Sequence, residues 1–109
     1  DNTLHLTMYQ IRSDLVLGLH HNLIQYWAFM QYLAHHGGRG IGSFTWIGGD
    51  CHIYDNHVDM AKRMINESIE PLEEIELVYN PTSEEFLADD FTLSAKYDPI
   101  IKESLEMTV

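Results

Sequence analysis

The stretch that organises this sequence is residues 48–57, which read Gly48-Gly49-Asp50-Cys51-His52-Ile53-Tyr54-Asp55-Asn56-His57. The apolar segment before it, residues 43–47, is typical of a β-strand that runs into the two glycines. His52 and Tyr54 are two residues apart, so in extended backbone their side chains point to the same face. An imidazole beside a phenol can both donate and accept hydrogen bonds, which suits a sugar hydroxyl. The alternative is a loop with polar residues before a helix.

The first part of the chain predicts a strand followed by a helix. In residues 3–9, Leu4, Leu6 and Met8 alternate with polar side chains, which indicates a strand with one apolar face. A chain that opens directly on a strand leads us to expect preceding sequence. Asn22 can cap a helix, and Gly37-Gly38 can end it. Between them the apolar residues keep helical spacing and predict a buried core helix: Leu23, Ile24, Trp27, Met30, Leu33 and Ala34.

The remaining elements are expected to be shorter. A second helix should follow Tyr54, with Asp55 or Asn56 as its cap and Val58, Ala61, Met64 and Ile65 facing inward. Residues 75–79, 91–93 and 104–108 are strand candidates, and residues 83–86 open a short helix at most. This order predicts an α+β fold in which a mostly antiparallel, twisted sheet packs on a long central helix and a second, shorter one.

Composition excludes some classes of function. The chain has 109 residues, 17 acidic and 6 basic, for a net charge of −11. Twelve of the acids follow residue 66, where only Lys96 and Lys102 are basic. Such a surface repels polyanions, so we expect no nucleic-acid partner. No apolar run approaches a membrane span, and a single cysteine, Cys51, fits a reducing cytoplasm.

Two blocks of sequence together resemble the thymidylate synthase family. The first is Tyr9-Gln10, Arg12-Ser13 and then Asp14-Leu15-Val16-Leu17-Gly18-Leu19-His20-His21-Asn22; the second is residues 49–57. The gap between the blocks matches, as does the ending Tyr97-Asp98-Pro99 with Met107-Thr108-Val109. The resemblance covers nearly the whole chain and makes residues 1–109 the C-terminal portion of a single domain. The family's nucleophilic cysteine would lie upstream.

The resemblance implies a site for a pyrimidine deoxynucleotide. Asn22 matches the asparagine that reads the pyrimidine edge, where relatives acting on deoxycytidylate carry aspartate; from the residues alone, Asn22 could equally be a helix cap. His52 and Tyr54 match the pair that binds the deoxyribose 3′-hydroxyl, and Asp50 is a possible supporting acid.

Arg12 and Ser13 are expected to bind phosphate, because a guanidinium fork beside a hydroxyl suits an anion. The register differs from the family pattern, which has Arg-Ser-x-Asp. With Asp14 aligned, Ile11 takes the arginine's place, so either a bulge lets Arg12 reach the phosphate or the phosphate site is altered.

The resemblance also implies a folate site. Asp14 matches the carboxylate that binds the pterin ring, although an internal hydrogen bond is equally plausible for it. Leu17 and Gly18 match the wall under the folate, and Thr108 would help to cover it. His20-His21 replaces the family's Pro-Phe; His21 stands where a phenyl ring packs on the folate, and an imidazole can still stack there.

The function implied by the resemblance is reductive methylation of dUMP to dTMP with 5,10-methylenetetrahydrofolate, in a cytoplasmic homodimer whose sheet faces meet and whose partner arginines complete each site. These residues alone are expected to be inactive without the missing N-terminal segment. The alternatives are a dUMP or dCMP hydroxymethylase of the same family, motivated by His20-His21, and a non-catalytic nucleotide-binding relict. The histidines lack HExxH spacing, so no metal is expected. Cys51 is not expected to act as a nucleophile with His52, because strand neighbours face opposite sides.

Overall fold

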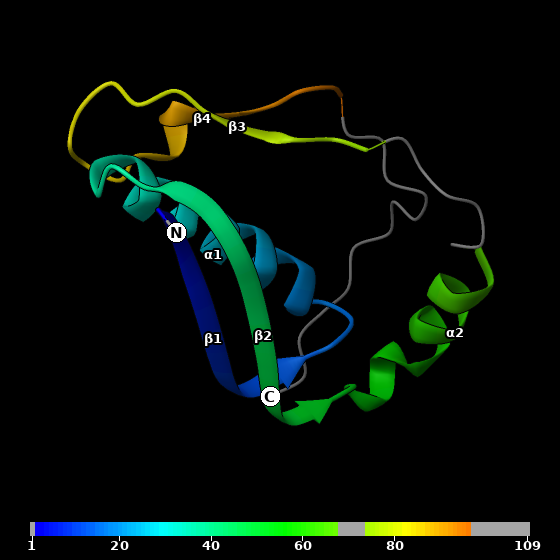
Figure 1. Ribbon diagram of the computed structural model, residues 1–109. Coiled ribbons are helices and arrows are strands. Elements are labelled where there is room, and N and C mark those ends of the chain that lie inside the picture. Colours follow the sequence, from blue (N-terminus) through cyan, green and yellow to red (C-terminus); the bar gives the residue numbers. More distant parts are fainter. Residues whose placement is uncertain (1, 68–73, 97–109) are drawn as a thin grey trace.

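The computed structural model describes residues 2–67 and 74–96, and it divides them into two small sheets and two helices (Figure 1). The chain order is β1 (Thr3–Asp14), α1 (Leu19–His36), β2 (Gly40–His52), a 3-10 turn (Asp55–His57), α2 (Val58–Glu67), β3 (Leu77–Tyr79), a second 3-10 turn (Ala88–Asp90) and β4 (Phe91–Leu93). The strand predicted at 104–108, with Thr108, lies outside the described residues.

The larger sheet is formed by β1 and β2, which pair in parallel. The expectation of a mostly antiparallel sheet was therefore wrong for this pair, and only β3 and β4 are antiparallel. The physical reason is the connection: a whole helix, α1, lies between β1 and β2, and such a crossover returns the chain to the same end of the sheet.

Helix α1 lies between the two sheets and contacts β1, β2 and β3 (Figure 1). It begins at Leu19, with Gly18 at its N-cap position, so the alternative that Asn22 caps the helix was wrong. Its end is as predicted: Gly38 takes a positive φ of 67°, which glycine adopts without strain, and the Arg39 amide donates to the Ala34 carbonyl.

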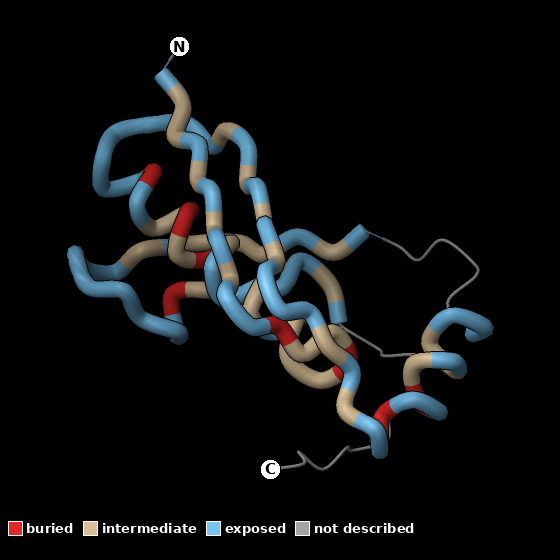
Figure 2. Tube along the Cα trace, turned by 90° about the horizontal axis from the view of Figure 1, so that it is seen from below, coloured by how far each residue is buried: buried red, intermediate tan, exposed pale blue. Residues whose placement is uncertain are grey.

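Burial follows the alternation of β1 and β2. The residues of β1 that face α1, such as Leu4, Leu6 and Met8, are partly buried, and their neighbours on the other face are exposed (Figure 2). Trp27 of α1 meets Phe44 of β2 edge to face, with ring centroids 6.1 Å apart. The small core contains Val16, Ala28, Met30, Ala34 and Met60.

Two predicted apolar faces are only partly buried. In α1, Ile24 is 56% exposed, and in α2, Ile65 is 77% exposed and Val58 41% exposed. Met60 is the buried residue of α2, whereas Ala61 and Met64 of the predicted face are partly buried. Helix α1 is thus a core helix on part of its circumference.

The smaller sheet is held by a buried carboxylate. The strand predicted at 91–93 is confirmed as β4, and the one predicted at 75–79 is shorter, Leu77–Tyr79. The short helix considered at 83–86 does not form. Asp90 is 4% exposed and accepts hydrogen bonds from the Thr82 hydroxyl at 2.7 Å and its amide at 3.4 Å, which fixes the segment as a bent loop.

Candidate functional site

The predicted site residues come from the C-terminal ends of β1 and β2, where the parallel register pairs Arg12 with Asp50 and Asp14 with His52. Paired residues of neighbouring strands lie on the same face of a sheet. Gln10, Asp14 and His52 therefore face the side that carries helix α1. The fold thus brings the two sequence blocks together at one end of the larger sheet.

A relay of three side chains holds Asn22. The Trp46 indole Nε1 donates to Gln10 Oε1 at 3.1 Å, and Gln10 Nε2 donates to Asn22 Oδ1 at 3.0 Å. All three side chains are partly buried, where a hydrogen bond is less weakened by competition with water. Asn22 is consequently an oriented amide in the first turn of α1, whose backbone N–H is already satisfied by the Gly18 carbonyl at 3.0 Å.

Asp14 stabilises the loop between β1 and α1. Its Oδ1 accepts hydrogen bonds from the Val16 amide at 3.1 Å and the Leu17 amide at 3.2 Å, so an internal role is observed. The loop is further tied to β2 by the Leu15 amide, which donates to the His52 carbonyl at 3.0 Å. These bonds occupy one carboxylate oxygen and leave the other for a different partner.

Gly18 connects Asp14 to Asn22. A Cβ placed on Gly18 would lie 3.5 Å from Asp14 Cβ and 3.6 Å from Asn22 Oδ1. Asn22 therefore lies close to Asp14, and Asp14 pairs with His52 across the strands. Asn22, Asp14 and His52 thus come from three elements that meet at one end of the larger sheet.

His52 and Tyr54 lie side by side as predicted, with ring centroids 5.3 Å apart. His52 Nδ1 lies 3.2 Å from the Asp50 carbonyl oxygen, and a carbonyl can only accept, so Nδ1 carries the proton in that bond. In neutral His52 the other ring nitrogen, Nε2, is then an acceptor. Asp50 Oδ1 is 3.9 Å from the same Nδ1.

Arg12 and Ser13 differ in their surroundings. Arg12 is exposed, whereas Ser13 is completely buried and its Oγ has no hydrogen-bond partner among the described residues. The only irregularity in the pairing of β1 with β2 falls between Leu4 and Leu6. The bulge considered near Arg12 is therefore absent, and the two side chains leave the strand on opposite faces.

His20 and His21 form a pair at the start of α1, with ring centroids 4.1 Å apart and planes tilted by 41°. Burial of the imidazole and the charge of His21 lower the pKa of His20 from its ordinary value of 6.5, and Asp14 partly opposes this effect. His20 therefore stays neutral to lower pH than a free histidine does.

This shift predicts a dependence of stability on pH. Because the folded state holds the pKa of His20 below 6.5, the unfolded chain binds the proton more readily. Above pH 6.5 His20 is neutral in both states, so its titration does not change the free energy of unfolding. As the pH falls below 6.5, the unfolded chain takes up the proton first, and the free energy of unfolding decreases. We expect the urea midpoint to decrease between pH 7.5 and 5, and to decrease less in His20→Gln. A His21→Gln chain should show an intermediate slope; equal slopes in all three proteins would contradict the assignment.

Sequence reasoning missed three residues of this region. Gln10 and Trp46 orient Asn22, and His57 is completely buried, with its ring 5.5 Å from that of Tyr54. Gln10 belongs to the first of the two sequence blocks, but only its hydrogen bond to Asn22 of α1 reveals its role. Trp46 lies in the strand predicted at residues 43–47, and a donor-bearing indole on the helix-facing side of β2 is the signal that could have found its role.

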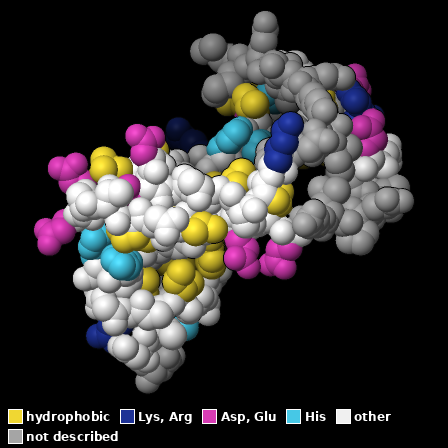
Figure 3. Space-filling view, turned by 90° about the horizontal axis from the view of Figure 1, so that it is seen from above, with side chains coloured by type: hydrophobic (Ala, Val, Ile, Leu, Met, Phe, Trp, Pro, Cys, Tyr) yellow, Lys and Arg dark blue, Asp and Glu magenta, His cyan; other side chains and the backbone are white. Residues whose placement is uncertain are grey.

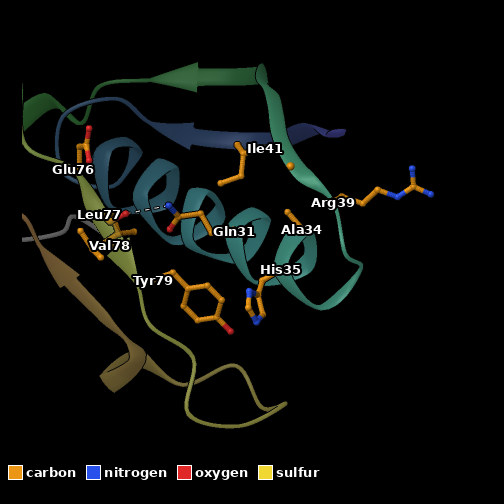
Figure 4. Close-up of a pocket in the computed structure, with 10 residues that line it drawn as sticks. Gln31, Ala34, His35, Arg39, Ile41, Glu76, Leu77, Val78 and Tyr79 are labelled. Carbon is orange, nitrogen blue, oxygen red and sulfur yellow. Dashed lines mark hydrogen bonds between the residues drawn. The ribbon is translucent and has the colours of Figure 1, made fainter. Parts of the chain in front are cut away.

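Two cavities of about 400 Å³ lie elsewhere in the molecule. The first lies between the C-terminal half of α1 and β3; Figure 4 shows the Gln31 amide donating to the Leu77 carbonyl there, with His35 and Tyr79 beside each other. The second is apolar, between α1 and the segment at Phe86, Ala88 and Phe91. Figure 3 shows hydrophobic side chains grouped on one face with acidic side chains around them. Neither cavity is lined by a predicted site residue.

Comparisons with known proteins identify the fold and the family. The structure is similar to that of thermostable thymidylate synthase A from Bacillus subtilis, with a TM-score of 0.74 and 33% sequence identity. The match covers 84% of this chain and 34% of that one, so the chain spans about a third of the length of this solved relative. The family model for thymidylate synthase matches residues 1–109. The chain belongs to the thymidylate synthase family.

Two further structural findings concern the described residues. Within residues 2–67 and 74–96, no three histidine, cysteine or acidic side chains are grouped as a metal site would require. None of the helices in this part of the chain is long and apolar enough to cross a membrane.

Proposed function

We propose that this chain provides the nucleotide-binding portion of an enzyme that methylates dUMP reductively to dTMP, with 5,10-methylenetetrahydrofolate as co-substrate. The observation that carries the proposal is the oriented Asn22 amide at the end of the sheet that also holds His52 and Tyr54. Membership of the family supports it. The nucleophile and further cationic groups would come from sequence upstream of residue 1.

In this proposal each side chain has a stated role toward dUMP. The Asn22 amide donates to O4 and accepts from N3–H of the uracil ring. His52 Nε2 and the Tyr54 hydroxyl bind the 3′-hydroxyl, and the exposed Arg12 guanidinium binds the phosphate as a charged donor. Ser13 was expected to share the phosphate, but its side chain is completely buried and leaves β1 on the face opposite to Arg12, so this proposal gives the phosphate contact to Arg12.

The residues expected at the folate fit that group. Methylenetetrahydrofolate would supply the one-carbon unit and the hydride when bound. Asp14 keeps one carboxylate oxygen for a ring N–H donor, because the loop amides use the other. Gly18 keeps the surface between Asp14 and Asn22 open, Leu17 adds apolar contact, and the exposed His21 ring can stack on an aryl group. Thr108 is proposed to cover the site.

The outer face of the β1–β2 sheet supports a homodimer. On this face Tyr9 is 63%, Ile11 69% and Ile47 46% exposed, and Tyr9 pairs with Ile47 across the strands. Grouped exposed apolar side chains mark interaction surfaces. We propose that two copies meet through this face and that arginines of the partner complete each nucleotide site, which would compensate for the few cations of this chain.

The test is binding followed by product analysis, on the protein made from the whole open reading frame that encodes this sequence. Isothermal titration should show binding of dUMP that exceeds binding of dCMP. Incubation with dUMP and methylenetetrahydrofolate should then yield dTMP by mass spectrometry. A hydroxymethyl product would replace the synthase by the hydroxymethylase alternative, which the exposed His20-His21 pair at the folate position favours. Nucleotide binding with no product would favour a non-catalytic relict.

A further inference from the structure

The polarity of the hydrogen-bond relay is set by its first member. An indole N–H can donate and cannot accept, so the atom of Gln10 that faces Trp46 must be its carbonyl oxygen. The other end of the Gln10 amide is then its NH₂ group, which can only donate, so Asn22 must turn its oxygen toward Gln10. One donor-only ring therefore fixes the orientation of two amides that could each rotate by half a turn.

The orientation of Asn22 matters because uracil and cytosine differ by an exchange of donor and acceptor. Uracil presents N3–H and O4, and cytosine presents an unprotonated N3 and an N4 amine, at the same two positions. An amide that has rotated by half a turn exchanges its own donor and acceptor in the same way. Asn22 held in one orientation matches one base, and Asn22 free to rotate matches both.

We propose that Trp46 is a specificity-determining positioning residue, which excludes cytosine nucleotides by fixing the Asn22 amide through Gln10. The inference rests on the proposed function, because it assumes that Asn22 reads a pyrimidine. In this proposal Trp46 does not itself contact the nucleotide. Trp46 changes the preference of the site for uracil over cytosine nucleotides.

The packing around Trp46 supports this role. A Cβ on Gly48 would lie only 2.3 Å from the Trp46 ring and 2.5 Å from Cys51 Sγ. Gly48 is also the residue paired with Gln10 across the sheet. The first glycine of the Gly48-Gly49 pair thus leaves the indole room to lie over β2 and reach the glutamine. A larger residue at position 48 would displace the donor that sets the relay.

The test compares two tryptophan variants in the protein from the whole reading frame, with dUMP and dCMP as probes in isothermal titration. Trp46→Phe keeps most of the ring and removes the N–H. Trp27→Phe is the matched control, since Trp27 packs edge to face on Phe44 on the same side of the sheet. We expect the preference for dUMP over dCMP to fall about tenfold in Trp46→Phe, the size of one net hydrogen bond, mainly through tighter dCMP binding. Trp27→Phe should keep the wild-type ratio.

A second variant tests the relay without altering the ring. Gln10→Glu still accepts from Trp46 but cannot donate, so Asn22 must rotate and donate to the new carboxylate. We expect dCMP to bind better than dUMP in this variant. Wild-type preference for dUMP that persists in both Trp46→Phe and Gln10→Glu would overturn the role of Trp46 and leave the proposed function standing. Absence of dUMP binding by the wild-type protein would overturn the proposed function, and this inference with it.

Discussion

Replacing Asn22 by aspartate should weaken dUMP binding by about 1,000-fold and make dCMP the preferred nucleotide. The carboxylate keeps the acceptor that Gln10 Nε2 contacts, so the relay that holds the side chain remains. It loses the amide donor and directs a negative oxygen at O4 of uracil, and sites built around a hydrogen bond reject the mismatched ligand by several orders of magnitude. The cytosine N4 amine instead donates to the carboxylate. Titration of both nucleotides against wild type and Asn22→Asp measures the inversion.

The control for this experiment is Asn66→Asp, which adds the same charge on the exposed surface of α2. It should bind both nucleotides as the wild-type protein does, because position 66 faces solvent and lies outside both motif blocks. If Asn22→Asp behaved like Asn66→Asp, Asn22 would be a structural amide at the start of the helix, and the assignment of the base-reading residue would be wrong.

The second large effect is expected at the outer face of the β1–β2 sheet. Ile11→Lys should convert the proposed homodimer to monomers. A symmetric interface receives the substitution twice, and each buried, unpaired ammonium costs at least about 2 kcal/mol. The dissociation constant should therefore rise by about 1,000-fold or more. Sedimentation velocity over a range of concentrations measures the change.

Ile65→Lys is the matched control for the dimer, since Ile65 is 77% exposed on α2 and lies off this sheet face. It should sediment as the wild-type protein does. A wild-type protein that is monomeric at micromolar concentration would contradict the proposed interface. A dimer unaffected by Ile11→Lys would assign the contact to another surface and leave the face with Tyr9 and Ile47 unexplained.

The local pattern of the chain was sufficient for several elements. Alternation in residues 3–9 predicted the first strand because one face of the strand packs on a helix. The glycine pair 37–38 predicted the end of α1 because a residue with positive φ closes the last turn there. The two-residue spacing of His52 and Tyr54 placed their rings together because side chains repeat every second residue in extended backbone.

Errors arose where a residue's environment depends on distant chain. Asn22 has the chemistry of a helix cap, but the helix starts at Leu19 and the amide bonds to Gln10 instead. The face of α2 was predicted only in part, because Met60 is buried while Val58 and Ile65 are exposed. The direction of β2 relative to β1 was misjudged because pairing direction follows from the connection between the strands, and the sequences of the two strands did not indicate it.

From its sequence alone this protein was recognisable as a member of the thymidylate synthase family, with its strands, its first helix and its polar motif residues identified, because those features repeat locally or lie in contiguous motifs. Only the tertiary structure decided that Trp46, Gln10 and Asn22 form one relay with a fixed direction. The reason is that each of the three comes from a different element, and a donor and an acceptor become partners only when packing brings them to within about 3 Å of each other.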